Sequence, residues 1–509
     1  MAAMSGPRIF VGKESHPVTT PAVRSRGPVT PVENGDGTIF VSIPSYRDGE
    51  RCGETLKALF ENAKNPDKIF VGLVEQNNAE DKFCMEQYCS SYAYDDLLSG
   101  VQTIKRNKIR EDMFKVVAEK RRGDCPRFDQ IGYVAYHNIN AKGPMLARSL
   151  ARKVLGNEEF CMQIDAHTDF AKDWDEILRD QWKRTKNEFG ILSTVPPPKS
   201  AKADYSPGGS EENDVPRQCM VKFRDNGFPD YESPADGRAL ELTEPLLSLG
   251  WSAAFSFAKC HLEETTPYDP FSYYAMPVEQ FSRYARFWTR GYDTYTPTKN
   301  VVFHDFELQA NGHGNNEWFK RQRDRFRKMA IKRAKTLIHA TYPKPTDVEL
   351  ANMGIYGLGK RRTLEQLADF ANIDFTIPRG NTGASLKCSD LEWVAYDASI
   401  SPVENLYDKP DNLESQPEYP RRTKLVYYEQ VEEPLPLPEM TTSTNIRPHE
   451  QVVDTFENVS ETNTNLPSAS LIFVLWTFGL IVWCAMFAST GSKAQRPARR
   501  KKAAMAKDV

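Results

Sequence analysis

The sequence lacks a strong excess of charge of either sign. Its 509 residues include 66 Lys and Arg against 69 Asp and Glu, for a net charge of −3, which excludes a globally basic nucleic-acid-binding protein. The mean hydropathy of −0.58 excludes a polytopic membrane protein. Because hydrophobic residues make up 40% of the chain and aromatic residues 11%, a wholly disordered chain is also excluded. The length suggests roughly two to four domain-sized units.

The cysteines lack the closely spaced CxxC pairs of a structural zinc site. They are odd in number and scattered along the chain, so we expect reduced, mostly buried thiols and no disulfide framework. The nine are Cys52, Cys84, Cys89, Cys125, Cys161, Cys219, Cys260, Cys388 and Cys484.

The N-terminal region lacks an apolar run long enough for a signal peptide. Residues 1–37 are rich in Pro, Gly, Ser and Thr, a composition that predicts a flexible leader.

The C-terminal region holds a long hydrophobic run. Residues 471–488 read LIFVLWTFGLIVWCAMFA without a charge, and a helix of that length spans about 27 Å, close to a bilayer core. We expect a transmembrane anchor at 469–490, with a buried core helix as the alternative. The preceding residues 377–466 predict a polar stem, since residues 401–466 hold 13 acidic and five basic side chains. The following residues 491–509 form a basic tail with seven Lys and Arg and one Asp.

Two arguments predict opposite orientations for this anchor. Without an N-terminal signal, insertion follows translation, so we expect a tail anchor with the large domain in the cytosol. The positive-inside rule instead keeps the basic tail in the cytosol and places the large domain in the lumen. A lumenal orientation in the secretory pathway is therefore the alternative.

The N-terminal half predicts an α/β fold with a mostly parallel central sheet. Strand-like text at Thr38–Pro44 precedes helix-like text at Glu54–Ala63 and a second strand-like run at Lys68–Glu75, which is the order of a parallel α/β unit. A further apolar run at Glu159–Ile164 ends in polar groups at Asp165.

Polar residues follow three of these predicted strands. Because ligands of open α/β sheets gather at the carboxyl ends of strands, we expect Ser42–Arg47, Gln76 and Asp165–His167 to line one crevice.

Two further segments have recognisable patterns. Residues Pro196–Pro216 are rich in Pro, Ser and Gly, which predicts a surface loop. Residues Trp318–His339 are dense in Arg and Lys with apolar positions at helical spacing. This pattern favours an ordinary solvated amphipathic helix over the alternative, an RNA-binding helix, and we expect no nucleic-acid partner.

The sequence Gln163-Ile164-Asp165-Ala166-His167 places a carboxylate and an imidazole two positions apart after a buried strand. In extended chain the side chains of Asp165 and His167 point the same way, so both can reach one divalent ion. A surface turn with a helix N-cap is the alternative interpretation of this D-x-H triplet.

Seven sequence blocks occur in order along the chain. They are IFVSIPSYRD (39–48), GPMLARSLA (143–151), QIDAHTDFAKDWDEIL (163–178), WSAAFSFAKCHL (251–262), PYDPFSYYAMPVEQFSRYARFWTRGYDTYTP (267–297), VVFHDF (301–306) and GLGKRRTLEQLADFANIDF (357–375). Together the blocks resemble the cytoplasmic hydroxyproline N-acetylglucosaminyltransferase family, which glycosylates an adaptor subunit of ubiquitin ligases. More distantly, they are similar to the mucin-type polypeptide N-acetylgalactosaminyltransferases. The resemblance covers about residues 38–376.

This resemblance implies a GT-A glycosyltransferase with a nucleotide-sugar-binding sheet, a divalent metal and retention of anomeric configuration. Asp165 and His167 match the family's D-x-H motif, and His304 matches its distant third metal ligand. A metal bridging the two phosphates neutralises the charge that develops when the diphosphate departs. Oxygen and imidazole ligands suit Mn²⁺ or Mg²⁺, and the two histidines favour Mn²⁺.

The resemblance also implies residues that bind the donor, UDP-GlcNAc. Ser45 and Arg47 match the first-strand block that meets the nucleotide, and Arg47 is suited to charge-assisted bonds to the pyrophosphate or uridine; the alternative is an ion pair with Asp48. Arg148 matches another donor-side position, near a helix N-terminus that follows Pro144. Gln76 is a candidate uracil contact.

Two candidates lie where the sequence departs from the family or permits a second interpretation. Trp251 is expected either to form an apolar wall for the sugar or acceptor or to pack in the core. Glu279 lies in Val278-Glu279-Gln280, where the family has G-E-E; it is our candidate for bonding donor-sugar hydroxyls. We name Glu279 and Asp165 as the catalytic candidates and assign no general base, since the departing phosphate can take the acceptor proton.

The resemblance thus implies transfer of N-acetylglucosamine to a protein hydroxyl of hydroxyproline, Ser or Thr, with a ubiquitin-ligase adaptor as an expected acceptor. Because of the altered 278–280 loop, transfer of another nucleotide sugar is an alternative. An inactive membrane-held scaffold protein of the same fold and a metal-dependent hydrolase of nucleotide sugars are further alternatives.

Overall fold

A computed structural model describes residues 6–11, 14–18, 35–78, 80–90, 125–231, 237–307, 317–338, 353–375, 385–386, 391–406 and 426–427. All of these belong to one unit, Met1–Met440. Within these ranges no helix has both the length and the apolar character needed to cross a membrane. The expected anchor at 469–490 and the basic tail at 491–509 lie outside the described residues.

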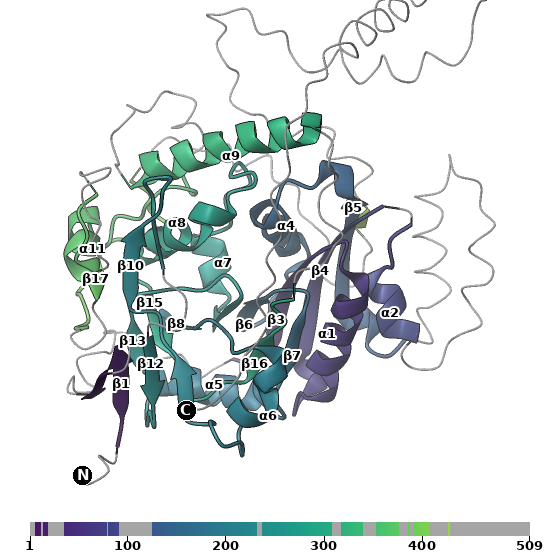
Figure 1. Cartoon of the computed structure of the whole chain (residues 1–509), viewed down its shortest axis with the longest axis horizontal. Helices are drawn as coiled ribbons and strands as arrows, with labels where there is room; N and C mark the ends of the chain where they lie inside the picture. Colours follow the sequence, from purple (N-terminus) through teal and green to yellow (C-terminus); the bar gives the residue numbers. More distant parts are fainter. Residues whose placement is uncertain are drawn as a thin grey trace, which may run out of the picture. The chain divides into compact units, whose positions relative to one another are not determined.

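Among the described residues the central sheet has nine strands and is mostly parallel, which confirms the predicted α/β class (Figure 1). Five of its strand pairs are parallel, and the three antiparallel pairs involve β13 and β14. In spatial order the strands are β13 (Leu246–Ser248), β15 (Asp293–Thr296), β8 (Gly190–Ser193), β14 (Phe255–Lys259), β6 (Phe160–Ile164), β3 (Ile39–Tyr46), β4 (Ile69–Asn77), β5 (Ile131–His137) and β18 (Val426–Tyr427).

Successive side chains of β3 belong to two apolar clusters, one on each face of the sheet. Ile39, Val41 and Ile43 belong to a large apolar cluster that includes residues of α1 (Gly49–Glu61) and α5 (Trp174–Thr185). Phe40 belongs to a second cluster with residues of α4 (Pro144–Ala151). Because successive side chains of a strand point to opposite faces, helices can cover both sides of this strand.

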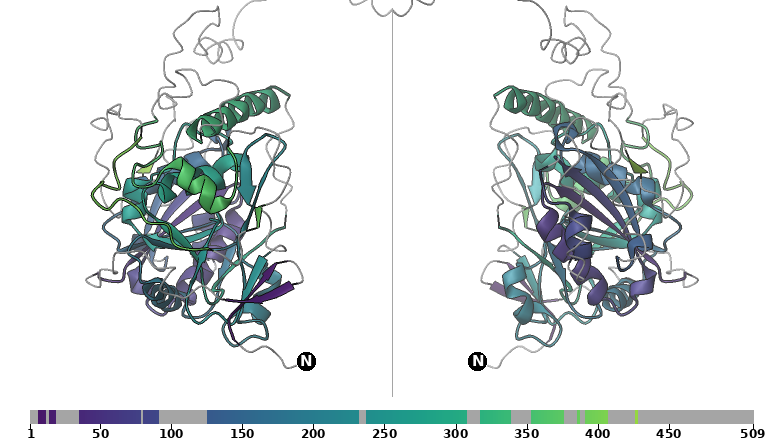
Figure 2. Two further views of the ribbon diagram at one scale, coloured as in Figure 1. Left: turned by 90° about the vertical axis from the view of Figure 1, so that its left-hand side faces the viewer. Right: turned by 90° about the vertical axis from the view of Figure 1, so that its right-hand side faces the viewer.

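Among the remaining elements of the unit, α9 and β1 lie at opposite ends (Figures 1 and 2). The α-helices are α2 (Cys84–Ser90), α6 (Lys202–Tyr205), α7 (His261–Thr265), α8 (Met276–Trp288), α9 (Glu317–Leu337) and α11 (Leu364–Ala371). The strands are β1 (Arg8–Val11), β2 (Glu14–Pro17), β7 (Thr168–Phe170), β9 (Asp214–Pro216), β10 (Met220–Phe223), β11 (Pro229–Tyr231), β12 (Gly237–Leu240), β16 (Val302–His304) and β17 (Ser385–Leu386). Short 3-10 turns are Pro66–Lys68, Phe128–Gln130, Asn138–Asn140, Arg152–Val154 and Lys199–Ala201.

The predicted amphipathic helix is present as α9. Ala330, Ala334 and Leu337 on one side of it are buried, and the ring of Phe326 packs edge-on against Tyr273 at 5.5 Å. This packing favours the ordinary amphipathic interpretation.

The prediction of a flexible leader at 1–37 is wrong for its first part. Residues of β1 pair antiparallel with β12, placing Ile9 opposite Ala239, and β2 pairs with β1. Ile9 is buried. Because an edge strand offers unpaired backbone groups, a short distant segment can complete the sheet without a strong local signal. The predicted loop Pro196–Pro216 likewise contains α6 and β9.

The prediction of a stem beginning at 377 is wrong for residues 391–406, which pack on the body. Leu391 and Tyr396 are buried, and the Arg362 guanidinium donates to the Val394 carbonyl through Nη2 at 2.6 Å. Carbonyl acceptors and a few apolar side chains suffice to hold a polar segment against a folded surface.

The prediction of reduced cysteines is also wrong. The structure contains the disulfides Cys52–Cys84, Cys89–Cys125 and Cys161–Cys260, with Cα–Cα distances of 5.1, 5.0 and 4.7 Å. The partners are 32, 36 and 99 residues apart in sequence. The α/β crossovers bring such distant positions together, which scattered spacing alone does not reveal.

Candidate metal and substrate site

The carboxyl ends of β3, β4 and β6 lie side by side because the three strands are parallel and neighbouring. The register places Tyr46 opposite Gln76, and the backbone N–H of Arg47 donates to the Gln76 carbonyl at 3.2 Å. Asp165 directly follows β6. The polar residues that follow these strands therefore share one edge of the sheet, where the sequence predicted a crevice.

His304 reaches this edge through a separate two-stranded sheet. β16 pairs antiparallel with β7, and the register places His304 opposite Thr168. The backbone N–H of His304 also donates to the Pro197 carbonyl at 2.9 Å. A residue 139 positions beyond Asp165 thus lies beside the D-x-H triplet, with its Nε2 3.1 Å from Oδ2 of Asp165.

Asp165, His167 and His304 form a cluster that we call the metal-side cluster. One potential ligand atom from each residue lies within 4.8 Å of the others. The two imidazole rings are 4.6 Å apart, centroid to centroid, and nearly perpendicular. One carboxylate and two imidazoles suit Mn²⁺ and related first-row ions, so the donor set fits the metal that the sequence predicts.

The cluster is partly open to solvent and its carboxylate is ionised. The side chains of Asp165, His167 and His304 are 25%, 25% and 11% exposed, which leaves room for ligands from a substrate. Burial alone would raise the pKa of Asp165. The hydrogen bond with His304 and the positive charge of Arg148 outweigh this effect and lower the pKa to about 2.

Arg148 connects the cluster to Glu279. Its side chain is 3% exposed, and its Nη2 donates to Oδ1 of Asp165 at 2.7 Å and to the Ala253 carbonyl at 3.2 Å. Its Nη1 pairs with the Glu279 carboxylate, which is 2% exposed. Burial lowers the pKa of Arg148, but Glu279 and the other nearby acidic groups raise it by more than burial lowers it. The net shift is therefore upward. Arg148 is therefore a permanent cation, and the observed partner of Glu279 is this arginine.

The structure places Arg47 at the end of β3 with a left-handed φ of 53°. Its guanidinium makes two bonds of 2.8 Å to the Asp81 carboxylate. The alternative partner from the sequence, Asp48, instead bonds to Arg51 and His167.

The other donor-side candidates are enclosed. Ser45 is fully buried, and within the described part of the chain its hydroxyl has no hydrogen-bond partner. Gln76 is buried and accepts a 2.8 Å bond from the hydroxyl of Tyr136. Trp251 is buried, and its indole N–H donates to Ser256 at 2.9 Å, which is the core-packing interpretation of this residue. The structure thus brings Arg148 and Glu279 to the metal-side cluster and encloses Ser45, Gln76 and Trp251.

Sequence reasoning missed the residues that support the cluster. Asp48, Arg51 and Asp305 form an ion-paired group beside His167. The available signal was Asp48, an acidic residue ahead of the helix-like text at Glu54–Ala63, since acidic residues favour helix N-caps. In the structure this carboxylate bonds to side chains, and no side-chain cap bond is present at α1.

Comparisons with known proteins extend this description. A family model described as Glycosyltransferase (GlcNAc) matches residues 38–377. No curated protein matches the chain.

Several solved structures share a distant likeness with the chain. One is GalNAc-T7 with UDP, GalNAc and Mn²⁺, at a TM-score of 0.38 and 11% identity, with 66% of this chain and 57% of that chain covered. Another is S. aureus TarS 1–349 in complex with UDP-GlcNAc, at a TM-score of 0.30 and 10% identity, with 63% of this chain and 70% of that chain covered. A third is the mannosyltransferase PcManGT from Pyrobaculum calidifontis with GDP-Man and Mn²⁺, at a TM-score of 0.30 and 12% identity, with 64% of this chain and 70% of that chain covered. The chain thus spans little more than half of GalNAc-T7.

Proposed function

Because the chain belongs to the Glycosyltransferase (GlcNAc) family, we propose that it moves N-acetylglucosamine from UDP-GlcNAc to a protein hydroxyl with retention of anomeric configuration. The observation that carries this proposal is the metal-side cluster, in which Asp165, His167 and His304 meet at the carboxyl edge of the sheet. Among protein hydroxyls, hydroxyproline, Ser and Thr are the proposed acceptors. The ubiquitin-ligase adaptor that the sequence resemblance implies is the acceptor of a cytoplasmic family, so it belongs with the cytosolic orientation of the body.

The three residues of the cluster would hold a divalent ion, Mn²⁺ or Mg²⁺. When bound, the ion supplies the positive charge that stabilises a departing diphosphate. Arg148 keeps Asp165 ionised and oriented through the 2.7 Å bond. The partial exposure of Asp165 and His167 leaves an open side toward which the diphosphate of the donor can bind.

The arrangement at Glu279 favours an alternative to N-acetylglucosamine as the donor sugar. The buried pairing of its carboxylate with Arg148 occupies the group that would otherwise bond to hydroxyls of the donor sugar. If the pairing persists with donor bound, sugar selection depends on other residues, and a different nucleotide sugar is the second candidate.

The test uses the full chain purified in detergent with Mn²⁺ and a panel of nucleotide sugars. We expect UDP release and a mass increase of one N-acetylhexosamine on acceptor peptides, with kcat/KM about 10³-fold lower in Asp165→Ala and His304→Ala. Asp67→Asn, on an 88% exposed side chain, is the matched control and should retain activity.

Each remaining alternative has its own signature in this assay. Equal activity in Asp165→Ala and wild type contradicts the metal-side assignment. Release of free sugar without a peptide product indicates a hydrolase. Metal-dependent donor binding without turnover on any acceptor indicates an inactive binding protein.

We also propose that the described body faces an oxidising compartment, with the predicted basic tail in the cytosol. Disulfides persist in oxidising compartments and are rare in the cytosol, so the disulfides Cys52–Cys84, Cys89–Cys125 and Cys161–Cys260 support the lumenal orientation over the cytosolic one. In sealed vesicles the body should resist added protease and thiol reagents until detergent is added. Digestion without detergent contradicts the orientation.

A further inference from the structure

We propose that Asp48, the N-cap of helix α1, and Thr55 within that helix are positioning residues that orient the D-x-H triplet for metal binding. This inference rests on the proposed function, because it assumes that His167 is a metal ligand. It concerns a different element of the fold, however, and the two can be tested separately.

Asp48 holds the imidazole ring of His167 in place. Nδ1 of His167 lies 2.8 Å from Oδ2 of Asp48, whose side chain is 7% exposed. This contact engages Nδ1 and fixes the direction of the ring. Nε2 is then the ring nitrogen left to bind a cation.

Arg51 holds Asp48 in place and links it to the strand that carries His304. Its Nε and Nη2 donate to the two carboxylate oxygens of Asp48 at 2.9 and 2.8 Å. Its Nη1 lies 3.3 Å from Oδ2 of Asp305. The backbone N–H of Asp305 in turn donates to the His167 carbonyl at 2.9 Å. One guanidinium therefore connects both segments that contribute to the metal-side cluster.

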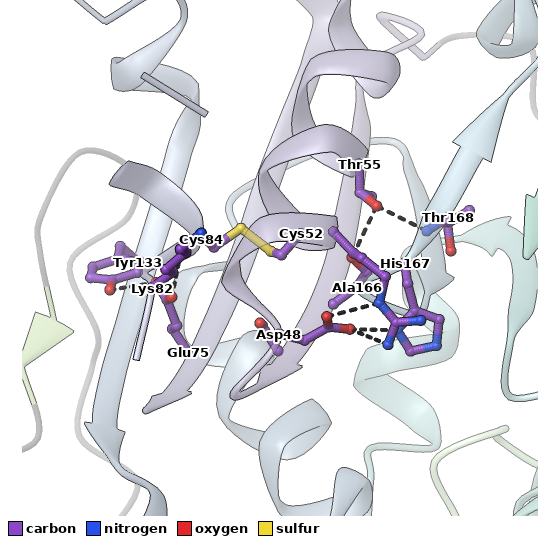
Figure 3. The surroundings of a disulfide bond; sticks show 12 residues. Asp48, Cys52, Thr55, Glu75, Lys82, Cys84, Tyr133, Ala166, His167 and Thr168 are labelled. Atoms are coloured by element: carbon purple, nitrogen blue, oxygen red, sulfur yellow. Dashed lines mark hydrogen bonds and ion pairs between the residues drawn. A yellow bond between two sulfur atoms is a disulfide. The ribbon is translucent and has the colours of Figure 1, made fainter. Parts of the chain in front are cut away.

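Thr55 holds the backbone on both sides of His167. Its hydroxyl donates to the Ala166 carbonyl at 2.9 Å and accepts from the N–H of Thr168 at 2.9 Å (Figure 3). Thr55 is buried. It lies seven positions after Asp48, two helical turns along the same face. Asp48 therefore contacts the side chain of His167, and Thr55 contacts the peptide groups on both sides of it.

Helix α1 is itself firmly fixed. Leu56 and Leu59 pack in the large core cluster, and the disulfide Cys52–Cys84 joins the helix to α2 (Figure 3). A rigid support is what a metal ligand requires, because partners of this kind orient the imidazole before the metal arrives.

The experiment measures Mn²⁺ affinity of the full chain by electron paramagnetic resonance, without nucleotide sugar. We expect Asp48→Asn and Thr55→Val each to weaken Mn²⁺ binding about 10–100-fold, the range for residues that support metal ligands. Thr55→Ser keeps the hydroxyl and should bind Mn²⁺ as wild type does. The matched controls are Asp67→Asn on the surface and Thr336→Val at a buried position of α9, and both should bind normally.

Enzyme kinetics give a second readout. In Asp48→Asn and Thr55→Val, saturating Mn²⁺ should restore most of kcat, whereas Asp165→Ala should stay inactive at any Mn²⁺ concentration. A purely structural role would lower activity without this metal dependence. If Thr55→Val fails to fold, as circular dichroism would show, the separate variants Asp48→Asn and Thr55→Ser still decide the question. We expect weakened Mn²⁺ binding in the first and normal Mn²⁺ binding in the second.

The outcomes separate the two proposals. If wild type binds Mn²⁺, His167→Ala does not, and both positioning variants bind as wild type, the inference on α1 fails and the metal site stands. If wild type and His167→Ala bind Mn²⁺ equally, the metal site itself fails.

Discussion

Glu75 and Asp165 lie near the carboxyl ends of two strands that flank β3, yet the protein gives the two carboxyl groups opposite properties. Burial raises the pKa of Glu75 to about 7, although hydrogen bonds from Tyr133, Cys84 and Asn77 lower it. Partly exposed Asp165 has a pKa of about 2, because His304 and Arg148 outweigh the effect of burial.

The two carboxyl groups differ in pKa because their hydrogen-bond donors differ in charge. Glu75 accepts from the Tyr133 hydroxyl at 2.7 Å and the Asn77 amide at 2.6 Å, which are uncharged. Asp165 accepts from the guanidinium of Arg148. A buried carboxylate with neutral donors tends to keep its proton, whereas one with a cationic donor stays ionised and can bind a metal. The ends of β4 and β6 thus supply one carboxyl group with uncharged donors and one with a cationic donor.

The largest expected effect comes from removing the cation that distinguishes Asp165. Arg148→Met leaves the buried Glu279 carboxylate without its partner, and we expect the free energy of unfolding to fall by about 3–5 kcal/mol. The shift in urea midpoint, followed by tryptophan fluorescence under oxidising conditions, measures this loss.

A double variant sharpens that prediction. Replacing both partners, in Arg148→Met with Glu279→Leu, removes the unpaired charge and should recover much of the lost stability. If the double variant is as unstable as Arg148→Met, charge pairing is not the reason for the loss.

The next effect concerns Glu75 and pH. Between pH 4.5 and about 7 the folded protein holds more protons than the unfolded chain at this residue. Its contribution to stability is therefore complete below pH 4.5 and is lost as pH rises through about 7. The size is about 3 kcal/mol at 1.36 kcal/mol per pKa unit. Glu75→Gln should remove this dependence, so the stability difference between variant and wild type should change by that amount between pH 4.5 and pH 8. An unchanged difference would show that Glu75 does not titrate in this window.

The smallest effect comes from one donor to Glu75. Tyr133→Phe removes the 2.7 Å bond and should cost about 2 kcal/mol at pH 8, where Glu75 is ionised, and less at pH 5. Chemical unfolding at the two pH values measures both losses. The matched control is Tyr231→Phe, since the hydroxyl of this buried tyrosine has no hydrogen-bond partner within the described residues. An equal loss at both pH values contradicts the coupling to Glu75.

Local sequence patterns predicted those parts of the sheet edge at β3, β4 and β6 that are formed by residues close together in sequence. The apolar runs at β3, β4 and β6 and the helix-like text after β3 correspond to observed elements. The D-x-H triplet was visible for the same reason, since it directly follows a buried strand.

Residues that act across long sequence distances were not predictable from such patterns. His304 joins the cluster through β16 and β7, and only the family resemblance indicated it. The pairing of Arg47 with Asp81 instead of Asp48 depends on how the chain turns after β4. The pairing of Ile9 with Ala239 and the disulfides seen among the described residues depend on tertiary contacts. Neither periodicity nor cysteine spacing carries information about such contacts.

The disulfide between Cys89 and Cys125 has a practical consequence for engineering. It holds the Cα atoms of these residues 5.0 Å apart, although the two residues are 36 positions apart in sequence. Chain added between such anchors closes a loop whose entropy cost grows only slowly with length. A fluorescent or affinity domain with adjacent termini, inserted in this segment, would therefore leave the register of β4 and β5 unchanged.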